Sequence, residues 1–285
     1  MSFQGHKEYI ASRLRNAPDV DVGEWHAMDV SGNPMLITKE VLNMTVSMDI
    51  PETMEELQES VMPNLPWAEA QFQERVSGEP LNPGETYKLW PWQSQMDKHR
   101  DKKFSHTYME RFWPKYAGEY QVWPDTQTWG LRYRLGDLDD VVQQLARNPL
   151  TRQAYLPVFF PEDTGNVNNV RIPCTLGYWF VCRKEGDETY LHMTYHIRSC
   201  DFIRHFADDV YLAARLCQWV LEQVKIQDSG TYTEAQMQGE EVPDKPFWWD
   251  VKPGILTMHI GSLHVMKGDM PKLMRGVEDA QTTGS

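Results

Sequence analysis

Residues 171–209 read RIPCTLGYWF VCRKEGDETY LHMTYHIRSC DFIRHFADD, and this stretch decides the fold. Two segments in it, Cys174–Arg183 and Thr189–Arg198, are rich in the aromatic and β-branched residues that strands favour. Glu185-Gly186-Asp187 separates them and has the composition of a tight turn. The sequence therefore predicts an antiparallel hairpin that ends in Arg-Ser-Cys-Asp at residues 198–201.

A long amphipathic helix follows the hairpin. Apolar residues recur with the helical period from Val210 to Val224, which predicts a helix over Ala207–Val224. Beyond it, Gln227–Gly254 is polar and contains Pro and Gly, so we expect a surface loop there, and we expect a loose tail over 276–285.

The remaining elements are predicted from the same kinds of pattern. Residues 1–50 carry few helical signals. We expect strands over Met35–Thr38, Val41–Met48, Ala154–Phe160 and Ile255–Val265, and helices beginning near Pro51-Glu52-Thr53 and spanning Trp67–Val76 and Asp137–Arg147. Helices and strands mix without a regular βαβ alternation. This indicates a single α+β domain over residues 1–285, with a mixed sheet and helices on one face.

Composition excludes several classes of function. The 285 residues carry a formal net charge of −13 at pH 7, whereas nucleic acids and anionic membranes are bound by basic surfaces. The longest apolar run, Tyr178–Cys182, is far shorter than a membrane span, and the N-terminus has no apolar signal-peptide core. Four cysteines in this length do not suggest a disulfide framework. We therefore expect a cytoplasmic protein that binds neither nucleic acid nor membrane.

Common ligand motifs are missing. The sequence has no phosphate-binding G-x-x-x-x-G-K-[ST], no G-x-G-x-x-G after a strand, no H-E-x-x-H and no C-x-x-C. We expect no metal site.

Three short motifs hold the chemical information, although each has an ordinary structural interpretation. Cys174 follows a proline at the start of a strand, where a buried thiol often only fills space. Arg198-Ser199-Cys200-Asp201 ends the next strand, and His264 lies in the last strand, in Gly-Ser-Leu-His-Val. Asp209 lies near the start of the long helix, where a carboxylate commonly acts as a cap.

The order of these motifs resembles the thymidylate synthase family. That family has Pro-Cys-His, then Arg-Ser-x-Asp, then an Asn eight residues after that Asp, then His-x-Tyr. The resemblance covers roughly residues 35–270 and includes Glu69-Ala-Gln-Phe72, Leu89-Trp90, Tyr108 and Asn148-Pro-Leu-Thr-Arg152. It implies a thymidylate synthase-like fold, dimerisation through the sheet and 5,10-methylenetetrahydrofolate as co-substrate.

Three departures from the pattern resemble one branch of the family, the deoxycytidylate hydroxymethylases of bacteriophages. The base-reading Asn is replaced by Asp209, the residue after the cysteine is Thr175, and the last strand reads Gly-Ser-Leu-His-Val. The first change has a chemical reason. Cytosine presents an exocyclic amine where uracil presents a carbonyl oxygen, and a carboxylate accepts from an amine. The predicted substrate is dCMP, the product 5-hydroxymethyl-dCMP.

The resemblance implies a role for each matching residue on the nucleotide side. Cys174 is the nucleophile that adds to C6 of the pyrimidine. The base is read by Asp209. The remaining substrate contacts are assigned to Arg198 and Ser199 on the phosphate, His264 on the sugar 3′-hydroxyl, Tyr108, and Arg152 donated by the partner subunit of a homodimer.

On the folate side, the resemblance implies that Glu69 relays protons through water and that Trp90 and Asp201 contact the folate ring. Two alternatives stay open. One is reduction of the same intermediate to 5-methyl-dCMP. The other is a catalytically inactive nucleotide-binding relative, against which the retention of Cys174 and Arg198 argues.

Overall fold

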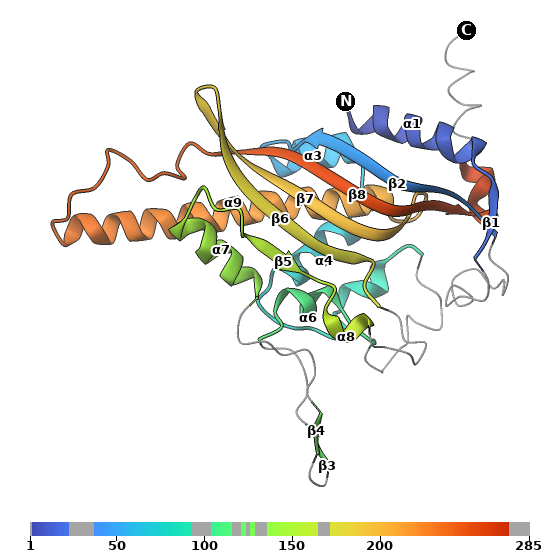
Figure 1. Ribbon diagram of the computed structural model, residues 1–285, viewed down its shortest axis with the longest axis horizontal. Helices are drawn as coiled ribbons and strands as arrows, with labels where there is room; N and C mark the ends of the chain where they lie inside the picture. Colours follow the sequence, from blue (N-terminus) through green and yellow to red (C-terminus); the bar gives the residue numbers. More distant parts are fainter. Residues whose placement is uncertain are drawn as a thin grey trace.

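The computed structural model describes residues 2–22, 37–92, 104–115, 121–123, 126–128, 136–164 and 172–273. Its centre is a six-stranded mixed sheet in the order β1-β2-β8-β7-β6-β5 (Figure 1). The strands are β1 (Asp19–Asp21), β2 (Ile37–Asp49), β5 (Tyr155–Pro157), β6 (Thr175–Glu185), β7 (Glu188–Asp201) and β8 (Lys252–Met266). A separate pair is formed by β3 (Gln121–Trp123) and β4 (Thr126–Thr128).

The predicted hairpin is confirmed as β6 and β7. Glu185 pairs with Glu188 across the turn, and Gly186 there has a φ of 64°, a left-handed conformation that glycine adopts without strain. The next strand pair in the sheet, β7 and β8, is parallel and not antiparallel. Parallel neighbours need a crossover connection, and the chain between β7 and β8 contains the long helix α9 (Phe206–Met237).

The helices pack mainly on one face of the sheet, so the predicted α+β class is confirmed. They are α1 (Phe3–Asn16), α3 (Met54–Val61), α4 (Trp67–Arg75), α6 (Tyr108–Phe112), α7 (Leu138–Arg147), α8 (Pro161–Thr164) and α9, with 3₁₀ turns η1 (Thr86–Leu89) and η2 (Lys267–Asp269). Of these, α3, α4, α7 and α9 lie behind the sheet in Figure 1. Thr53 and Asp137 cap α3 and α7 with reciprocal side-chain bonds, which explains why both helices begin where the sequence predicts.

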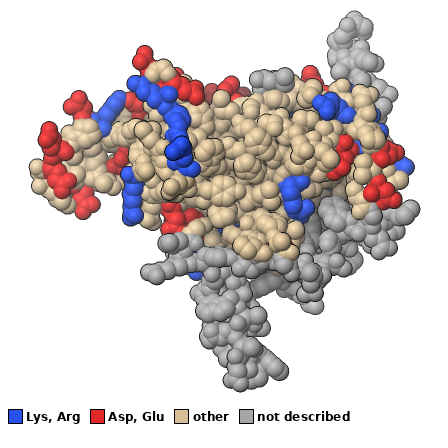
Figure 2. Space-filling view, in the orientation of Figure 1, with Lys and Arg blue, Asp and Glu red and all other residues tan. Residues whose placement is uncertain are grey.

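The opposite face of the sheet is bare in the described part of the chain (Figure 1). It carries polar pairs in its middle, where Thr45 contacts His259, Ser47 contacts Thr257, and the rings of His196 and His259 stack 5.2 Å apart. Exposed apolar side chains lie toward its ends, including Tyr155 and Ile255. Figure 2 shows this face with few charges in its middle and with acidic and basic side chains gathered toward its ends.

Several predicted boundaries were wrong. Met35–Thr38 and Val41–Met48 are not two strands, since β2 runs unbroken from Ile37. The strand expected over Ala154–Phe160 shortens to β5. Helix α1 was missed because only Phe3, Ile10 and Leu14 form its buried stripe. The predicted tail at 276–285 lies outside the described residues.

The largest error concerns the expected loop over Gln227–Gly254. Helix α9 continues to Met237, although its apolar period ends at Val224. The returning chain supports this extension. Asp228 accepts a 2.9 Å bond from the backbone of the fully buried Trp248, and the Tyr232 hydroxyl donates to Pro243 at 3.0 Å.

Within the described residues, no helix has an apolar stretch long enough to cross a membrane.

The helical extension predicts opposite effects for two glycines nine residues apart. Gly230 lies inside α9 with open space around it, so Gly230→Ala should stabilise the protein by about 0.5–1 kcal/mol. Gly239 lies just after the helix with a φ of 75°, so Gly239→Ala should destabilise it by about 1 kcal/mol. Urea unfolding of both variants measures this. A Gly230→Ala variant less stable than the parent protein would show that residues 227–237 are not helical.

Candidate active site

The predicted site residues gather where β6 begins and where β7 and β8 end. The parallel register places Ser199 beside Ser262 and Asp201 beside His264. The antiparallel register places Thr175, which follows Cys174, beside Ile197. Three motifs that are distant in sequence therefore meet at one end of the sheet.

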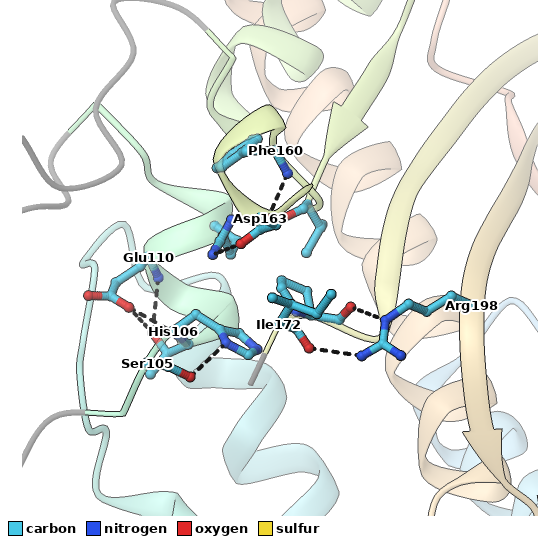
Figure 3. A network of polar contacts seen from close by, with 11 residues as sticks. Ser105, His106, Glu110, Phe160, Asp163, Ile172 and Arg198 are labelled. Carbon is cyan, nitrogen blue, oxygen red and sulfur yellow. Dashed lines mark hydrogen bonds and ion pairs between the residues drawn. The ribbon is translucent and has the colours of Figure 1, made fainter. Parts of the chain in front are cut away.

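Arg198 stabilises the segment that contains Cys174 through hydrogen bonds to its backbone. Its Nε donates to the Pro173 carbonyl at 2.8 Å and its Nη2 to the Ile172 carbonyl at 3.1 Å, as Figure 3 shows. The same Nη2 lies 3.9 Å from Cys174 Sγ, and the Arg198 backbone N–H donates to the Cys174 carbonyl at 2.8 Å. A guanidinium this close to sulfur favours the thiolate over the thiol.

Helix α6 lines the site beside Cys174. Thr175 donates to the Tyr108 hydroxyl at 3.2 Å and shares a 2.8 Å bond with the Tyr195 hydroxyl. Burial raises the pKa of the Tyr108 hydroxyl, so this group is a neutral donor at ordinary pH. The helix is anchored by a buried ion pair, in which Arg111 binds both oxygens of Asp163 at 2.8 and 2.9 Å.

Asp209 projects from the first turn of α9 toward β7. Its carboxylate accepts a 3.4 Å bond from Cys200 Sγ. Burial raises the pKa of Asp209 to about 7, against the opposing effect of Arg75. The capping alternative is not supported, because no side chain caps α9 at its N-terminus and the neighbouring Asp208 instead binds Asn64 twice at 2.8 Å.

Asp201 and His264 form a buried pair at the ends of the parallel strands. One oxygen of Asp201 accepts from the backbone N–H groups of Ile203 and Arg204 at 2.9 and 3.0 Å. The other oxygen is buried without a hydrogen bond in the described part of the chain. Burial raises the pKa of Asp201 and lowers that of His264.

Aromatic rings lie next to this pair. Trp90 stacks on His205 at 4.9 Å and tilts against Trp67 at 6.1 Å. The indole N–H of Trp90 is buried with no acceptor among the described residues. Asp201 Oδ2, the oxygen without a hydrogen bond, lies 3.8 Å from Arg204 Nε. A donor on Trp90 and an acceptor on Asp201, neither with a hydrogen bond among the described residues, are suited to a flat heterocycle such as the ring of a folate.

Two predicted residues stand apart from the cluster. Arg152 is exposed, and among the described residues only its backbone carbonyl has a hydrogen bond, from Trp179 Nε1 at 3.0 Å. Glu69 faces α9, where Arg215 binds both of its oxygens at 3.0 and 3.1 Å and Tyr211 donates at 2.6 Å. No hydrogen bond or ion pair joins Glu69 to Cys174 or Asp209 in the described part of the chain.

The environment of Glu69 weakens it as a base. Burial raises the pKa of Glu69, but hydrogen bonds from Arg215, Tyr211 and Gln73 outweigh burial and leave the pKa below its usual value. The structure therefore does not bring the predicted water-relay residue into the cluster. Its carboxylate is committed to an ion pair between α4 and α9.

Arg75 was not predicted from the sequence as a site residue. This residue lies on the apolar side of α4, in register with Ala68 and Phe72, and is 8% exposed. A charged residue at a core position of an amphipathic helix was the available signal. Cys200, which binds Asp209, was also passed over.

Comparison with solved structures supports the fold. The chain is similar to a thermostable thymidylate synthase A from Bacillus subtilis, with a TM-score of 0.57 and 14% sequence identity. The match covers 96% of this chain and 83% of that one. The chain has the thymidylate synthase-like fold. No protein-family model and no curated protein sequence matches it.

A surface cavity of about 730 Å³ opens at the other end of the sheet, where β8 begins. Its lining includes Lys225, Trp249 and Lys252 and none of the predicted site residues.

The raised pKa of Asp209 predicts a pH-dependent difference in stability. An unfolded Asp has a pKa of about 3.9, whereas Asp209 has about 7 in the folded protein, so the folded state binds the proton more tightly. The stability contributed by that proton is present below pH 4 and is lost as pH rises through 7. Asp209→Asn should thus become more stable relative to the parent protein between pH 5 and pH 8, measured by urea unfolding. A difference that stays constant over this range would contradict the raised pKa.

Proposed function

We propose that the protein transfers a one-carbon unit from 5,10-methylenetetrahydrofolate to C5 of dCMP, giving 5-hydroxymethyl-dCMP. The observation that carries the proposal is that Cys174 and Asp209 lie on either side of the end of β7. Arg198 Nη2 lies 3.9 Å from Cys174 Sγ, and Cys200, two residues after Arg198 on β7, donates its thiol to Asp209 at 3.4 Å. The end of β7 therefore lies between the proposed nucleophile, Cys174, and the proposed base-reading acid, Asp209.

The proposed reaction begins with the Cys174 thiolate as the nucleophile. Sulfur bonds to C6 of cytosine, which makes C5 nucleophilic, and C5 then bonds to the one-carbon unit. Loss of the C5 proton and departure of tetrahydrofolate leave an exocyclic methylene. Water adds to this carbon as the Cys174–C6 bond breaks, so the nucleotide gains CH₂O overall and the thiolate is regenerated.

Asp209 provides the base selectivity in this proposal. Its carboxylate accepts from the exocyclic amine of cytosine, and it repels the O4 oxygen of uracil. In its protonated form it also donates, which suits N3 of cytosine. A pKa near 7 makes both forms accessible at neutral pH.

The remaining nucleotide contacts surround that pair. Arg198 has already used Nε and Nη2 on the cysteine loop, which leaves Nη1 for the phosphate together with Ser199. We assign His264 to the sugar 3′-hydroxyl and Tyr108, through its hydroxyl, to the pyrimidine side. The indole N–H of Trp90 and Asp201 Oδ2, which lies 3.8 Å from Arg204 Nε, would hold the folate ring.

Glu69 has a role other than that of a base in this proposal. With Arg215 on both oxygens, its carboxylate is a poor base. In the proposed reaction it orients water through remaining lone pairs and does not itself abstract a proton.

We propose a homodimer, which the exposure of Arg152 and the bare face of the sheet in the described part of the chain support. One cation on Arg198 is little for a nucleotide phosphate, and the exposed side chain of Arg152 makes no hydrogen bond or ion pair with a described residue of its own chain. Packing the bare faces of two sheets together would bring Arg152 of the partner subunit to the phosphate.

Product analysis tests the proposed reaction. The protein is incubated with methylenetetrahydrofolate and dCMP, dUMP or CMP, and the nucleotides are analysed by mass spectrometry. We expect dCMP alone to gain the mass of CH₂O. A gain of CH₂ would show reduction to 5-methyl-dCMP, and no change with any nucleotide would favour the inactive relative.

Mixed mutants test the shared site. Arg152→Ala and Cys174→Ala should each be inactive, and mixing them should restore partial activity because a heterodimer rebuilds one intact site. The control mixes Arg152→Ala with the Arg152→Ala/Cys174→Ala double variant, which rebuilds none. If subunits exchange but only the control level of activity is seen, Arg152 does not act across a dimer.

A further inference from the structure

An irregularity at the start of β6 turns Thr175 toward the helix-covered face of the sheet. The register with β7 shifts between Thr175 and Gly177, as it does at a β-bulge. Side chains alternate between the two faces along a strand, so the extra residue turns Thr175 to the same face as the buried Tyr178. Thr175 is fully buried, whereas Leu176 beside it is exposed. The hydroxyl that follows the candidate nucleophile therefore lies away from the bare face of the sheet.

Three hydroxyl groups form a chain at this point. The Thr175 hydroxyl donates to the Tyr108 hydroxyl at 3.2 Å and lies 2.8 Å from the Tyr195 hydroxyl. Thr175 has a single hydroxyl hydrogen, and the bond to Tyr108 uses it. Tyr195 is therefore the donor in the second bond. The chain runs in one direction, from Tyr195 through Thr175 to Tyr108.

The chain ends at Tyr108, whose own hydroxyl hydrogen has no acceptor among the described residues. Burial raises the pKa of Tyr108 and of Tyr195, so both hydroxyls keep their hydrogens at ordinary pH. The side chain of Tyr108 is partly buried, and its bond to Thr175 places it next to the segment that contains Cys174. Polar groups in such positions normally have a partner, so an oriented donor at this point is suited to bind a ligand.

The ring of Tyr108 is held in place independently of its hydroxyl. The Arg75 guanidinium lies over this ring in a cation–π contact, with Cζ 4.1 Å from the ring centroid. The indole N–H of Trp113 donates to the Arg75 carbonyl at 2.8 Å, and reciprocal capping bonds fix the start of α6. Rotation of the hydroxyl hydrogen about the C–O bond is therefore the main freedom left to Tyr108, and the bond from Thr175 limits it.

We propose that Thr175 is a positioning residue, which holds the Tyr108 hydroxyl so that its hydrogen is directed at an acceptor atom of the pyrimidine. Tyr195 acts through Thr175, because its own bond leaves the Thr175 hydroxyl one direction in which to donate. Each bond in such a chain polarises the next, which makes Tyr108 a stronger donor. This inference rests on the proposed function and identifies what orients one of its substrate contacts.

A purely structural role for Thr175 predicts a different result. A buried hydroxyl that only satisfies its neighbours would affect dCMP binding through packing, whether or not Tyr108 carries a hydroxyl. A hydroxyl that orients Tyr108 would affect binding only while the Tyr108 hydroxyl is present. Removing the two hydroxyls singly and together therefore separates the two roles.

The ¹³Cζ resonance of Tyr108 tests the chain without any ligand. In protein with labelled tyrosine it is assigned by its loss in Tyr108→Phe. Thr175→Val keeps the shape and removes the donor, so the resonance should move, whereas Thr175→Ser should stay near the parent value. Tyr195→Phe should move it less and in the same direction. Thr38→Val is the matched control, because Thr38 is equally buried in the same sheet but its hydroxyl has no partner among the described residues.

Calorimetric binding of dCMP to the same variants, without folate, tests the consequence. Tyr108→Phe should weaken binding about fivefold, the size of one neutral hydrogen bond. Thr175→Val should weaken it about threefold, and Thr175→Ser and Thr38→Val by less than about twofold. In the Tyr108→Phe background, Thr175→Val should have no further effect.

Two results overturn the inference. One is a Tyr108 resonance that does not move in Thr175→Val, and the other is a Thr175→Val loss of equal size with and without the Tyr108 hydroxyl. A resonance that does not move in Tyr195→Phe removes Tyr195 from the chain. The Ser variant protects the test against misfolding, because it retains the hydroxyl at position 175.

Failure of the proposed function looks different. In that case the parent protein binds no dCMP, which removes the nucleotide as the acceptor. The Tyr108 resonance still decides whether Thr175 orients the Tyr108 hydroxyl.

Discussion

The candidate active site depends on the parallel pairing of β7 and β8. Every other pairing in the main sheet is antiparallel within the described residues, and this one cannot be closed by a turn. The chain returns through α9, whose first turn crosses the strand ends. One constraint thus places Ser199 beside Ser262, Asp201 beside His264, and Asp209 above Cys200. Without the crossover, these motifs would lie on separate parts of the molecule.

The charged side chains around the ends of β7 and β8 differ in how fully they are paired. Arg111 and Asp163 neutralise one another and only support α6, and Arg215 does the same with Glu69 between two helices. Arg198 is divided between loop carbonyls and sulfur. Arg75 Nε is buried with no hydrogen-bond acceptor among the described residues, and the side chain of Asp209 accepts only from Cys200 there. Buried charged groups without an ion-pair partner are expected where a ligand completes the pairing. Charged side chains without an ion-pair partner therefore identify the candidate active site more clearly than the ion pairs do.

Much of the fold could be predicted from local pattern. The hairpin, α3, α4 and α7 carry turn, cap and period signals in their own residues, and the structure has them where they were expected. The extension of α9 could not be predicted in this way, because it depends on Asp228 and Tyr232 binding a chain segment that returns later. Helix α1 carries too narrow an apolar stripe to be recognised before its packing is known.

Site residues could be predicted where the order of the motifs along the sequence identifies them. They could not be predicted where the direction of a side chain determines whether it reaches the site. Cys174, Arg198, Asp201, Asp209 and His264 were named from the sequence and lie at one end of the sheet. Glu69 matched the same pattern, yet Arg215, 146 positions later, draws it toward α9. Arg75 has no counterpart in the motif, and only burial and the missing partners distinguish it.

Covalent trapping tests the central claim most directly, namely that Cys174 adds to a cytosine nucleotide. The C5 proton must leave in the proposed reaction, and fluorine cannot leave in its place as a cation, so 5-fluoro-dCMP with methylenetetrahydrofolate should stall with sulfur still bonded to C6. Peptide mass mapping should then find the nucleotide on the peptide containing Cys174, and should find none on the Cys174→Ser variant. No adduct, or an adduct on Cys182, Cys200 or Cys217, would contradict the account.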